Sequence, residues 1–352
     1  RPAAAMAGGA AEPREHALPA LRTRCRTPTI AHLVFGASGI GCLYEDVPES
    51  QARATVEAAL AAGIDHLDTA PWYGAGLSER RLGEALEGRS GVVVSTKCGR
   101  IVRPLAETDP RTDRVERHYI GHFITEAYHA DIPVADCTAE GVRESFRQSC
   151  ARLRRERLDC LRLHDAEDEE RWRQATEGCG VEAMLELKRQ GLVGEVGLGM
   201  GSAEYALRYL RKYPKGTFDS LMLAGCWNLI DQDGLEVLRE CQRLEVRVVN
   251  AGIFASGLLW GSSTYKYHEV PREVAARAER WRELAAEFGL SLPQAALAFA
   301  LLPEVVERAA VGCSRPEQAA GNAALCGAGA PAGLWLRARG AGLLAEDLAL
   351  PE

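Results

Sequence analysis

Short apolar runs alternate with longer amphipathic stretches from residue 30 to near the end of the chain. The runs rich in Val, Leu and Ile are typical of buried strands, and the stretches with helical spacing of apolar residues are typical of helices packed on one face. The predicted strands are residues 32–35, 66–68, 92–96, 159–163, 195–198, 220–223, 246–250 and 309–311. The predicted helices are residues 51–62, 79–86, 139–153, 181–190, 203–212, 234–243, 272–288 and 316–325.

This alternation of strands and helices predicts a parallel sheet. Eight strand and helix pairs favour a closed barrel over an open doubly wound sheet, because closure leaves no edge strand. We therefore predict an α/β protein with one (β/α)8 TIM barrel over residues 29–346, a disordered or targeting tail at residues 1–28 and a C-terminal tail at residues 347–352. Two long connections, residues 100–137 and 259–269, are interpreted as lids over substrate and cofactor.

The composition supports a globular protein whose partners are small molecules. Apolar residues make up 47% of the 352 residues, and the formal net charge of −7 argues against nucleic-acid binding. No apolar run reaches the roughly 20 residues of a membrane span. The 11 cysteines include no CxxC pair and no Cys/His spacing that suits zinc, so we expect no metal and a reducing compartment. We expect a cytoplasmic monomer or weak homodimer, although the acid-poor residues 1–28 leave organellar targeting open.

Four ionisable residues lie at or just beyond the ends of predicted strands: Asp68, Tyr73, Lys97 and His164. The carboxyl ends of all strands in a parallel barrel face the same mouth, so these side chains should converge. A phenol is a poor base at neutral pH, but a nearby ammonium group favours its ionised form, and we expect Lys97 to lower the pKa of Tyr73. Asp68 would keep the lysine charged, and His164 would hydrogen-bond a substrate oxygen. Taken singly, each residue also fits a plainer role, as a helix cap, a rim aromatic, a surface charge or a core histidine.

The segment DTAPWYG at residues 68–74, with Thr96-Lys97 and Leu163-His164, resembles the aldo-keto reductase superfamily over residues 22–344. The resemblance implies a (β/α)8 barrel, NAD or NADP as the cofactor that carries the hydride, and the four residues above as the catalytic tetrad. Residues 224–232, 252–259 and 332–335 are similar to the aldose 1-dehydrogenase branch, which includes L-fucose, D-threo-aldose and L-galactose dehydrogenases, with pyridoxal 4-dehydrogenase nearby. That likeness implies oxidation of a sugar at C1 to the lactone.

The same resemblance assigns cofactor contacts at three places. The adenosine end would be held where a strand meets a helix start, whose free N–H groups and dipole favour phosphate. The residues that match are Gly36, Ala37 and Ser38 for the nicotinamide side, Ser256 and Gly257 for the pyrophosphate, and Gly312, Ser314, Arg315, Gln318 and Asn322 for the adenosine end. Ser314 stands where a basic residue for the 2′-phosphate is frequent, and the neighbouring guanidinium of Arg315 suits phosphate, so NAD and NADP both stay open.

The chain departs from the family at three positions that usually hold the nicotinamide ring. Met200 stands in place of Asn, Ala224 in place of Gln and Ala251 near the position of a Tyr. Trp72 and Trp227 are candidates to line a sugar pocket, and each also fits a core aromatic.

Other interpretations weigh less. The segment GASGIG at residues 36–41 resembles the glycine-rich turn of short-chain dehydrogenases, but a lone glycine motif is weak, and the Tyr-x-x-x-Lys pair of that class is absent from the chain. Within the oxidoreductases, a general NADPH-dependent aldehyde or ketone reductase and a pyridoxal 4-dehydrogenase are the alternatives. Outside them, the alternative is a barrel that binds the nucleotide as a regulatory subunit.

Overall fold

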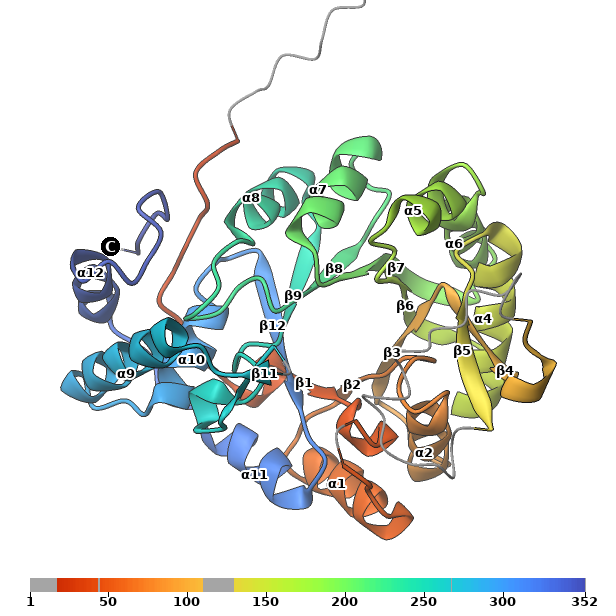
Figure 1. Cartoon of the computed structure of the whole chain (residues 1–352), viewed down its shortest axis with the longest axis horizontal. Helices are drawn as coiled ribbons and strands as arrows, with labels where there is room; N and C mark the ends of the chain where they lie inside the picture. The colour runs from red at the N-terminus through yellow and green to blue at the C-terminus, as the bar shows by residue number, and fades with distance from the viewer. Residues whose placement is uncertain (1–17, 44, 110–129, 267, 352) are drawn as a thin grey trace, which may run out of the picture.

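The computed structural model describes residues 18–43, 45–109, 130–266 and 268–351, and its centre is a closed barrel of eight parallel strands (Figure 1). Around the barrel the strands follow the order β1-β12-β9-β8-β7-β6-β3-β2, and β2 pairs again with β1 through Phe35 and Leu67. The strands are β1 Leu33–Gly36, β2 His66–Asp68, β3 Val93–Cys98, β6 Leu158–His164, β7 Val193–Met200, β8 Ser220–Ala224, β9 Arg247–Ala251 and β12 Val306–Gly312. All eight predicted strands are confirmed, and the predicted fold class with them.

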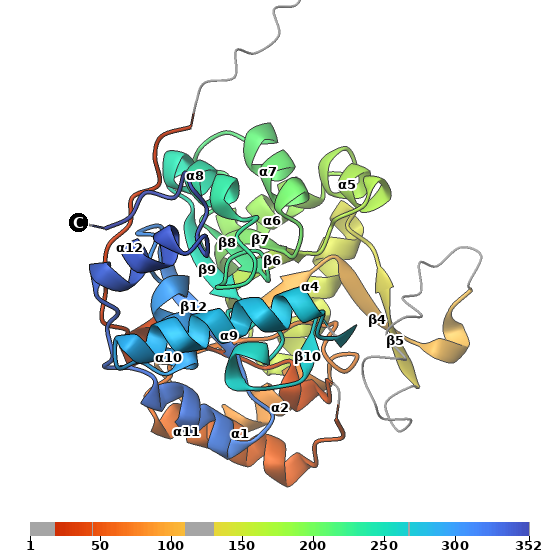
Figure 2. The same ribbon diagram turned by 60° about the vertical axis from the view of Figure 1, so that its left-hand side comes forward.

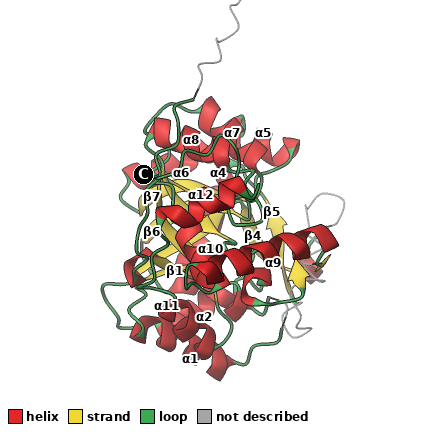
Figure 3. Cartoon of the chain, turned by 90° about the vertical axis from the view of Figure 1, so that its left-hand side faces the viewer, coloured by secondary structure: helices red, strands yellow, loops and turns green. Residues whose placement is uncertain are grey.

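Helices enclose the barrel on its outside (Figure 3). They are α1 Glu49–Ala61, α2 Leu77–Ala85, α4 Ala139–Leu153, α5 Glu169–Thr176, α6 Gly180–Arg189, α7 Ala203–Lys212, α8 Leu235–Leu244, α9 Arg272–Glu287, α10 Leu292–Ala300, α11 Pro316–Ala324 and α12 Ala332–Gly340. Single 3-10 turns occur at Ile30–His32, Gly39–Gly41, Leu105–Glu107 and Leu258–Trp260. The eight predicted helices are confirmed, whereas α5, α10 and α12 were not predicted. None of the helices in the described part of the chain is both long and apolar enough to cross a bilayer.

The interior of the barrel is apolar on one side and polar on the other. Strand side chains alternate between the helices and the barrel axis. On the strands β1, β12, β9 and β8, the inward positions carry the small apolar cluster Val34, Ala310, Val249 and Met222. On β2, β3 and β6 the corresponding positions carry ionisable or hydroxyl side chains, all buried: His66, Asp68, Ser95, Lys97, Arg162 and His164. A buried polar half of this kind needs internal partners for every charge, and it marks the side of the barrel where chemistry is to be sought.

The two long connections are partly ordered by short antiparallel strands. In the first, β4 Arg100–Pro104 pairs with β5 Asp131–Ala135, and this hairpin projects beyond the ring of helices (Figure 2). It is fastened to α4 by Gln148, which exchanges two hydrogen bonds with the backbone of Val102 at 2.9 and 3.2 Å. The rest of that predicted lid, residues 110–129, lies outside the described residues.

The second connection contains β10 Thr264–Tyr265 and β11 His268–Glu269. Asp231, in the loop after β8, accepts hydrogen bonds from the Tyr265 hydroxyl at 2.8 Å and from Lys266 Nζ at 3.0 Å. These bonds hold the connection against the carboxyl end of the barrel, the end at which the strand-terminal residues lie.

Parts of both predicted tails, residues 1–28 and 347–352, are packed against the barrel. Residues 1–17 lie outside the described residues, but Leu21 is buried and the Arg24 amide donates to the Leu302 carbonyl at 3.0 Å. At the other end Leu348 is buried, and the Thr23 hydroxyl donates to the Ala349 carbonyl at 2.8 Å. Residues 18–28 and 347–351 therefore pack on the barrel and on each other.

Candidate active site

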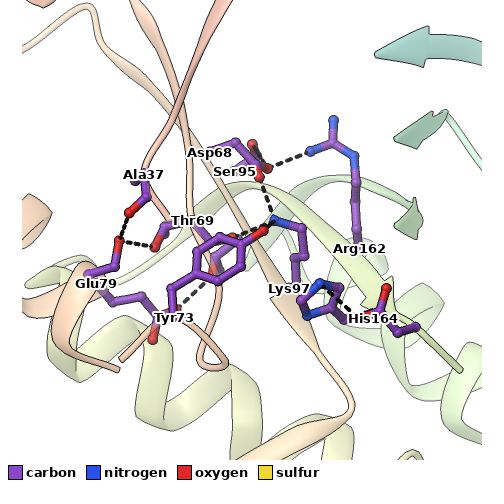
Figure 4. Close-up of polar contacts among 12 residues, drawn as sticks. Ala37, Asp68, Thr69, Tyr73, Glu79, Ser95, Lys97, Arg162 and His164 are labelled. Atoms are coloured by element: carbon purple, nitrogen blue, oxygen red, sulfur yellow. Dashed lines mark hydrogen bonds and ion pairs between the residues drawn. The ribbon is translucent and has the colours of Figure 1, made fainter. Parts of the chain in front are cut away.

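Asp68 lies at the centre of the buried polar half and is held by three donors. Its Oδ1 accepts from the ammonium of Lys97, while its Oδ2 accepts from Ser95 Oγ at 2.6 Å and from Arg162 Nη1 at 3.1 Å (Figure 4). All four side chains are buried. The two cations Lys97 and Arg162 and the single carboxylate of Asp68 give this group a net positive charge, which stabilises a negatively charged or electron-rich group beside it.

The electrostatics fix the charge state of this pair. Burial alone would raise the pKa of Asp68, but Lys97 and Arg162 outweigh burial and hold that pKa below its usual value. Burial would lower the pKa of Lys97, but Asp68 and Tyr73 outweigh it and hold the lysine pKa above its usual value. Asp68 is thus an anion and Lys97 a cation at neutral pH.

Tyr73 is placed by a tight turn that follows β2. A Cβ at Gly74, where φ is 67°, would come within 2.5 Å of the Gly41 carbonyl, so only glycine allows the two loops to approach this closely. Beyond the turn, Ser78 Oγ accepts from the Thr69 hydroxyl at 2.9 Å and donates to the Ala37 carbonyl at 2.8 Å. This packing leaves little freedom to the loop that carries the phenol.

The phenol of Tyr73 lies beside Lys97 and His164, as predicted. Lys97 Nζ donates to the Tyr73 hydroxyl oxygen at 3.2 Å and to the Thr69 carbonyl at 2.8 Å. The rings of Tyr73 and His164 lie edge to face, with centroids 6.0 Å apart. Since the lysine occupies the oxygen as a donor, the O–H of Tyr73 is left to donate elsewhere. The predicted convergence of Asp68, Tyr73, Lys97 and His164 is what the structure shows.

The expected direction of the Tyr73 pKa is wrong. Burial raises the pKa of Tyr73 and is the largest effect; Lys97 lowers it, but Asp68 raises it again, and the pKa ends above its usual value. Without further positive charge, the phenol stays protonated at neutral pH. Tyr73 is therefore poised as a proton donor, and becomes a base only under more alkaline conditions or beside an added cation.

His164 is neutral. Burial, and after it the cations Arg100 and Lys97, hold the pKa of His164 well below its usual value. Arg100 Nη1 donates to the His164 carbonyl at 3.0 Å, and His164 Nε2 lies 3.4 Å from a carboxylate oxygen of Asp165. A neutral imidazole donates a hydrogen bond from one ring nitrogen and accepts one at the other. With Tyr73 it offers two polar groups to a single carbonyl or hydroxyl oxygen.

The predicted cofactor residues lie along one arc of the mouth. They follow β9, β12 and β1, which are neighbours in the barrel. Ser256 and Gly257 come after β9, Gly312 ends β12, and Gly36 ends β1 just ahead of Ala37 and Ser38. Gly312 is exposed, and a Cβ there would meet nothing within 4 Å. Such open backbone beside the N-terminus of α11 fits a dinucleotide, whose phosphates need close approach to N–H groups.

Two of the predicted contacts at the adenosine end are engaged within the protein. Gln318 Oε1 accepts from the backbone amides of Ser314 and Arg315 at 2.7 and 3.2 Å, and Asn322 Nδ2 donates to Cys313 Sγ at 3.3 Å. Both side chains therefore hold the turn between β12 and α11. Ser314 and Arg315 present their side chains to a residue that the sequence did not single out, Glu45.

Of the two tryptophans proposed for a sugar pocket, Trp227 is in the hydrophobic core. It is fully buried and stacks on Phe299 of α10, with centroids 4.8 Å apart. The loop after β8 turns outward from the barrel at this point, and Asn250 Nδ2 fixes it by donating to the Trp227 carbonyl at 2.9 Å. Trp72 lies at the site, where the guanidinium of Arg100 covers its ring at 4.9 Å.

The residues at the three departures from the family do end strands at the mouth: Met200 ends β7, Ala224 ends β8 and Ala251 ends β9. Met200 is buried, whereas Ala224 is exposed. None of the three offers a polar side chain to a nicotinamide ring, and the Met200 side chain packs in the main hydrophobic core.

Sequence reasoning missed Arg162 and Arg100. Arg162 lies within the apolar run Leu158–His164, where a charged residue is out of place, and that misfit was the available sign of a buried counter-ion. Arg100 follows the predicted strand that carries Lys97, and it looked like an ordinary loop residue.

Comparison with known proteins agrees with this geometry. The model of the aldo/keto reductase family matches residues 32–328. A D-threo-aldose 1-dehydrogenase from a Pseudomonas species is 34% identical over 315 residues, covering 87% of this chain and 92% of the relative. A pyridoxal 4-dehydrogenase from Microbacterium luteolum is 30% identical, covering 90% and 95%. Among solved structures, a glycerol dehydrogenase from Gluconobacter oxydans superposes with a TM-score of 0.67 at 20% identity, covering 94% of this chain and 97% of the other.

Proposed function

The chain belongs to the aldo/keto reductase family of NAD(P)-dependent oxidoreductases, and from that premise we propose that it oxidises an aldose at C1 to the lactone. The substrates proposed are aldoses of the L-fucose, L-galactose or D-arabinose type. The observation that carries this proposal is the 34% identity to a D-threo-aldose 1-dehydrogenase across 87% of the chain, together with a complete set of proton-transfer residues.

The proposed reaction needs one proton and one hydride to leave the sugar. NAD or NADP, when bound, supplies the acceptor for the hydride from C1. Tyr73 takes the proton of the C1 hydroxyl, which leaves a C=O double bond at C1 and, with the ring oxygen, the lactone. Lys97, bonded to the phenol oxygen at 3.2 Å, stabilises the negative charge that Tyr73 carries before it takes the proton.

The other members of the site position the substrate. His164, neutral and edge-on to Tyr73, hydrogen-bonds the C1 oxygen and orients it toward the phenol. Asp68 keeps Lys97 charged and in place. Trp72 offers a flat ring at the mouth, against which the C–H face of a sugar packs.

The cofactor is proposed to lie along the arc that runs from β9 over β12 to β1. Gly36, Ala37 and Ser38 would face the nicotinamide side, and Ser256 and Gly257 the pyrophosphate. Ser314 and Arg315, at the start of α11, would face the adenosine end; Gln318 and Asn322 would support that turn from behind. The open backbone at Gly312 supports this placement of the cofactor.

Two alternatives have an observation in their favour. The 30% identity to a pyridoxal 4-dehydrogenase over 90% of the chain favours pyridoxal as a substrate. The raised pKa of Tyr73 favours a protonated phenol, which suits the reduction of an aldehyde or ketone, since the phenol then donates its proton to the new alkoxide.

A substrate panel tests the proposal. The purified protein is incubated with NAD or NADP and with L-fucose, L-galactose, D-arabinose or pyridoxal, and with the reduced cofactors and simple aldehydes for the reverse direction. We expect reduced nicotinamide and a lactone product with at least one aldose, and loss of both in Tyr73→Phe. If neither direction shows turnover while nucleotide binding is retained, the enzymatic proposal fails and a regulatory role for the barrel gains support.

A further inference from the structure

Glu45 joins the loop after β1 to the neighbouring turn before α11. It lies in the connection between β1 and α1, yet its carboxylate accepts from Ser314 Oγ at 2.5 Å and from Arg315 Nη2 at 2.5 Å. The serine is buried, whereas the Arg315 side chain is 56% exposed and that of Glu45 is 35% exposed. The three side chains form one cluster on the surface of the proposed adenosine end.

The charge of this cluster is balanced at neutral pH. The hydrogen bond from Ser314 is the largest effect and lowers the pKa of Glu45; burial raises it, and the guanidinium of Arg315 lowers it further, so the pKa ends below its usual value. Glu45 is therefore an anion and cancels the charge of Arg315. The guanidinium that the sequence offers for a phosphate is already satisfied by a carboxylate.

Other donors at this turn are engaged as well. The backbone amides of Ser314 and Arg315 both donate to Gln318 Oε1. Within the described residues, a phosphate arriving here would have to displace Glu45 from Arg315, displace Gln318 from the amides, or stand beside the Glu45 carboxylate. A hydroxyl group meets no such obstacle, because it can donate a hydrogen bond to the free lone pairs of Glu45.

We propose that Glu45 makes this enzyme select NAD over NADP. NADP differs from NAD by a phosphate on the 2′-oxygen of the adenosine ribose, a group that is mostly dianionic near neutral pH. Glu45 accepts a hydrogen bond from the 2′-hydroxyl of NAD and repels the 2′-phosphate of NADP. Glu45 selects by repulsion as well as by attraction. It also occupies the guanidinium of Arg315, which would otherwise donate to the phosphate. This inference rests on the placement of the adenosine end proposed above.

Binding measurements without any sugar test the inference separately from the proposed reaction. The dissociation constants of NADH and NADPH are measured by quenching of protein fluorescence for the natural protein and for Glu45→Gln. Glu57→Gln is the matched control, because Glu57 is also an acid paired with an arginine, Arg53, at 3.0 Å, but on the outer helix α1. Thermal unfolding checks that all the variants are folded.

We expect the natural protein and Glu57→Gln to bind NADH more tightly than NADPH. In Glu45→Gln the affinity for NADPH should rise by about tenfold, equivalent to about 1.4 kcal/mol, while the affinity for NADH changes by less than about threefold. Adding Arg315→Ala to Glu45→Gln should remove the gain for NADPH, because the guanidinium released from Glu45 is what binds the phosphate.

Three outcomes would overturn the inference. One is a natural protein that binds NADPH at least as tightly as NADH, and another is an unchanged NADH to NADPH ratio in Glu45→Gln. The third is an equal change in Glu57→Gln, which would show a general effect of net charge. Preference for NADH with no turnover of any aldose would sink only the proposed reaction, and the inference would stand.

Discussion

His66 should make the fold lose stability as the pH falls below 6.5. This histidine begins β2, is buried inside the barrel, and lies with Nε2 3.1 Å from Ser95 Oγ. Burial, followed by the neighbouring charge of Arg162, lowers the pKa of His66 from 6.5 to about 3. The folded protein thus keeps a neutral imidazole over a pH range in which the unfolded chain binds a proton.

The size of the effect follows from that difference. Between the unfolded pKa of 6.5 and the folded pKa of about 3, the unfolded state holds one proton more, so the free energy of unfolding decreases as the pH is lowered. Each pH unit in this window removes about 1.4 kcal/mol, which amounts to about 2 kcal/mol by pH 5 and to about 5 kcal/mol by pH 3. Above pH 6.5 the histidine is neutral in both states and contributes nothing to the pH dependence.

Urea unfolding at about pH 7.5 and about pH 5 measures this contribution for the natural protein and for His66→Gln, which keeps a polar group toward Ser95. We expect His66→Gln to lose about 2 kcal/mol less than the natural protein on going to the lower pH. His268→Gln, a change of the same kind on the exposed strand β11, should behave like the natural protein. An equal loss of stability in His66→Gln and the natural protein would show that protonation of His66 does not destabilise the fold.

Two further predictions concern residues that the structure separates by role. Lys97→Met removes the ammonium donor to Tyr73 and should lower kcat by at least about 100-fold while nucleotide binding is kept; a loss of less than tenfold in single-turnover measurements would contradict the role of the lysine. Trp227→Ala should destabilise the fold by about 3 to 5 kcal/mol in urea because it opens a cavity in the core, with KM for the sugar unchanged. Trp72→Ala should raise KM with a smaller loss of stability, and a reversal of these two patterns would show that the tryptophans have been assigned the wrong roles.

Most strands of the barrel could be predicted from the sequence because they contain short runs of apolar residues and alternate with helices. Two of the missed helices have an unusual composition. α10 (LPQAALAFA) is apolar on almost all sides because it is buried. α5 (EERWRQAT) is almost wholly polar, and its N-cap is Asp168, whose carboxylate accepts from two backbone amides. The hairpin of β4 and β5 joins segments separated by 26 residues, so no local pattern pairs them.

The convergence of Asp68, Tyr73, Lys97 and His164 could be predicted because strand ends of one barrel must meet at its mouth. The pKa of Tyr73 could not, because its direction depends on how completely burial removes the phenol from water, and burial outweighs the contribution of Lys97. Trp227 was expected in the sugar pocket but lies in the core. The sequence of a loop does not show on which side of the barrel an aromatic side chain packs. Glu45 was missed because its partners, Ser314 and Arg315, are about 270 residues away and become neighbours only when β12 closes the barrel onto β1.

The role of Tyr73 is tested by the pH dependence of C1 oxidation, measured with an aldose carrying hydrogen or deuterium at C1, because a rate difference between the two shows that hydride transfer is being observed. Because burial holds the pKa of Tyr73 above its usual value of 10, the rate for the natural protein should keep rising with pH above neutrality. Tyr73→Phe should be slow at every pH and should lack this rise. A Tyr73→Phe variant with the natural rate and the natural pH profile would contradict the assignment of Tyr73 as the proton-transfer residue.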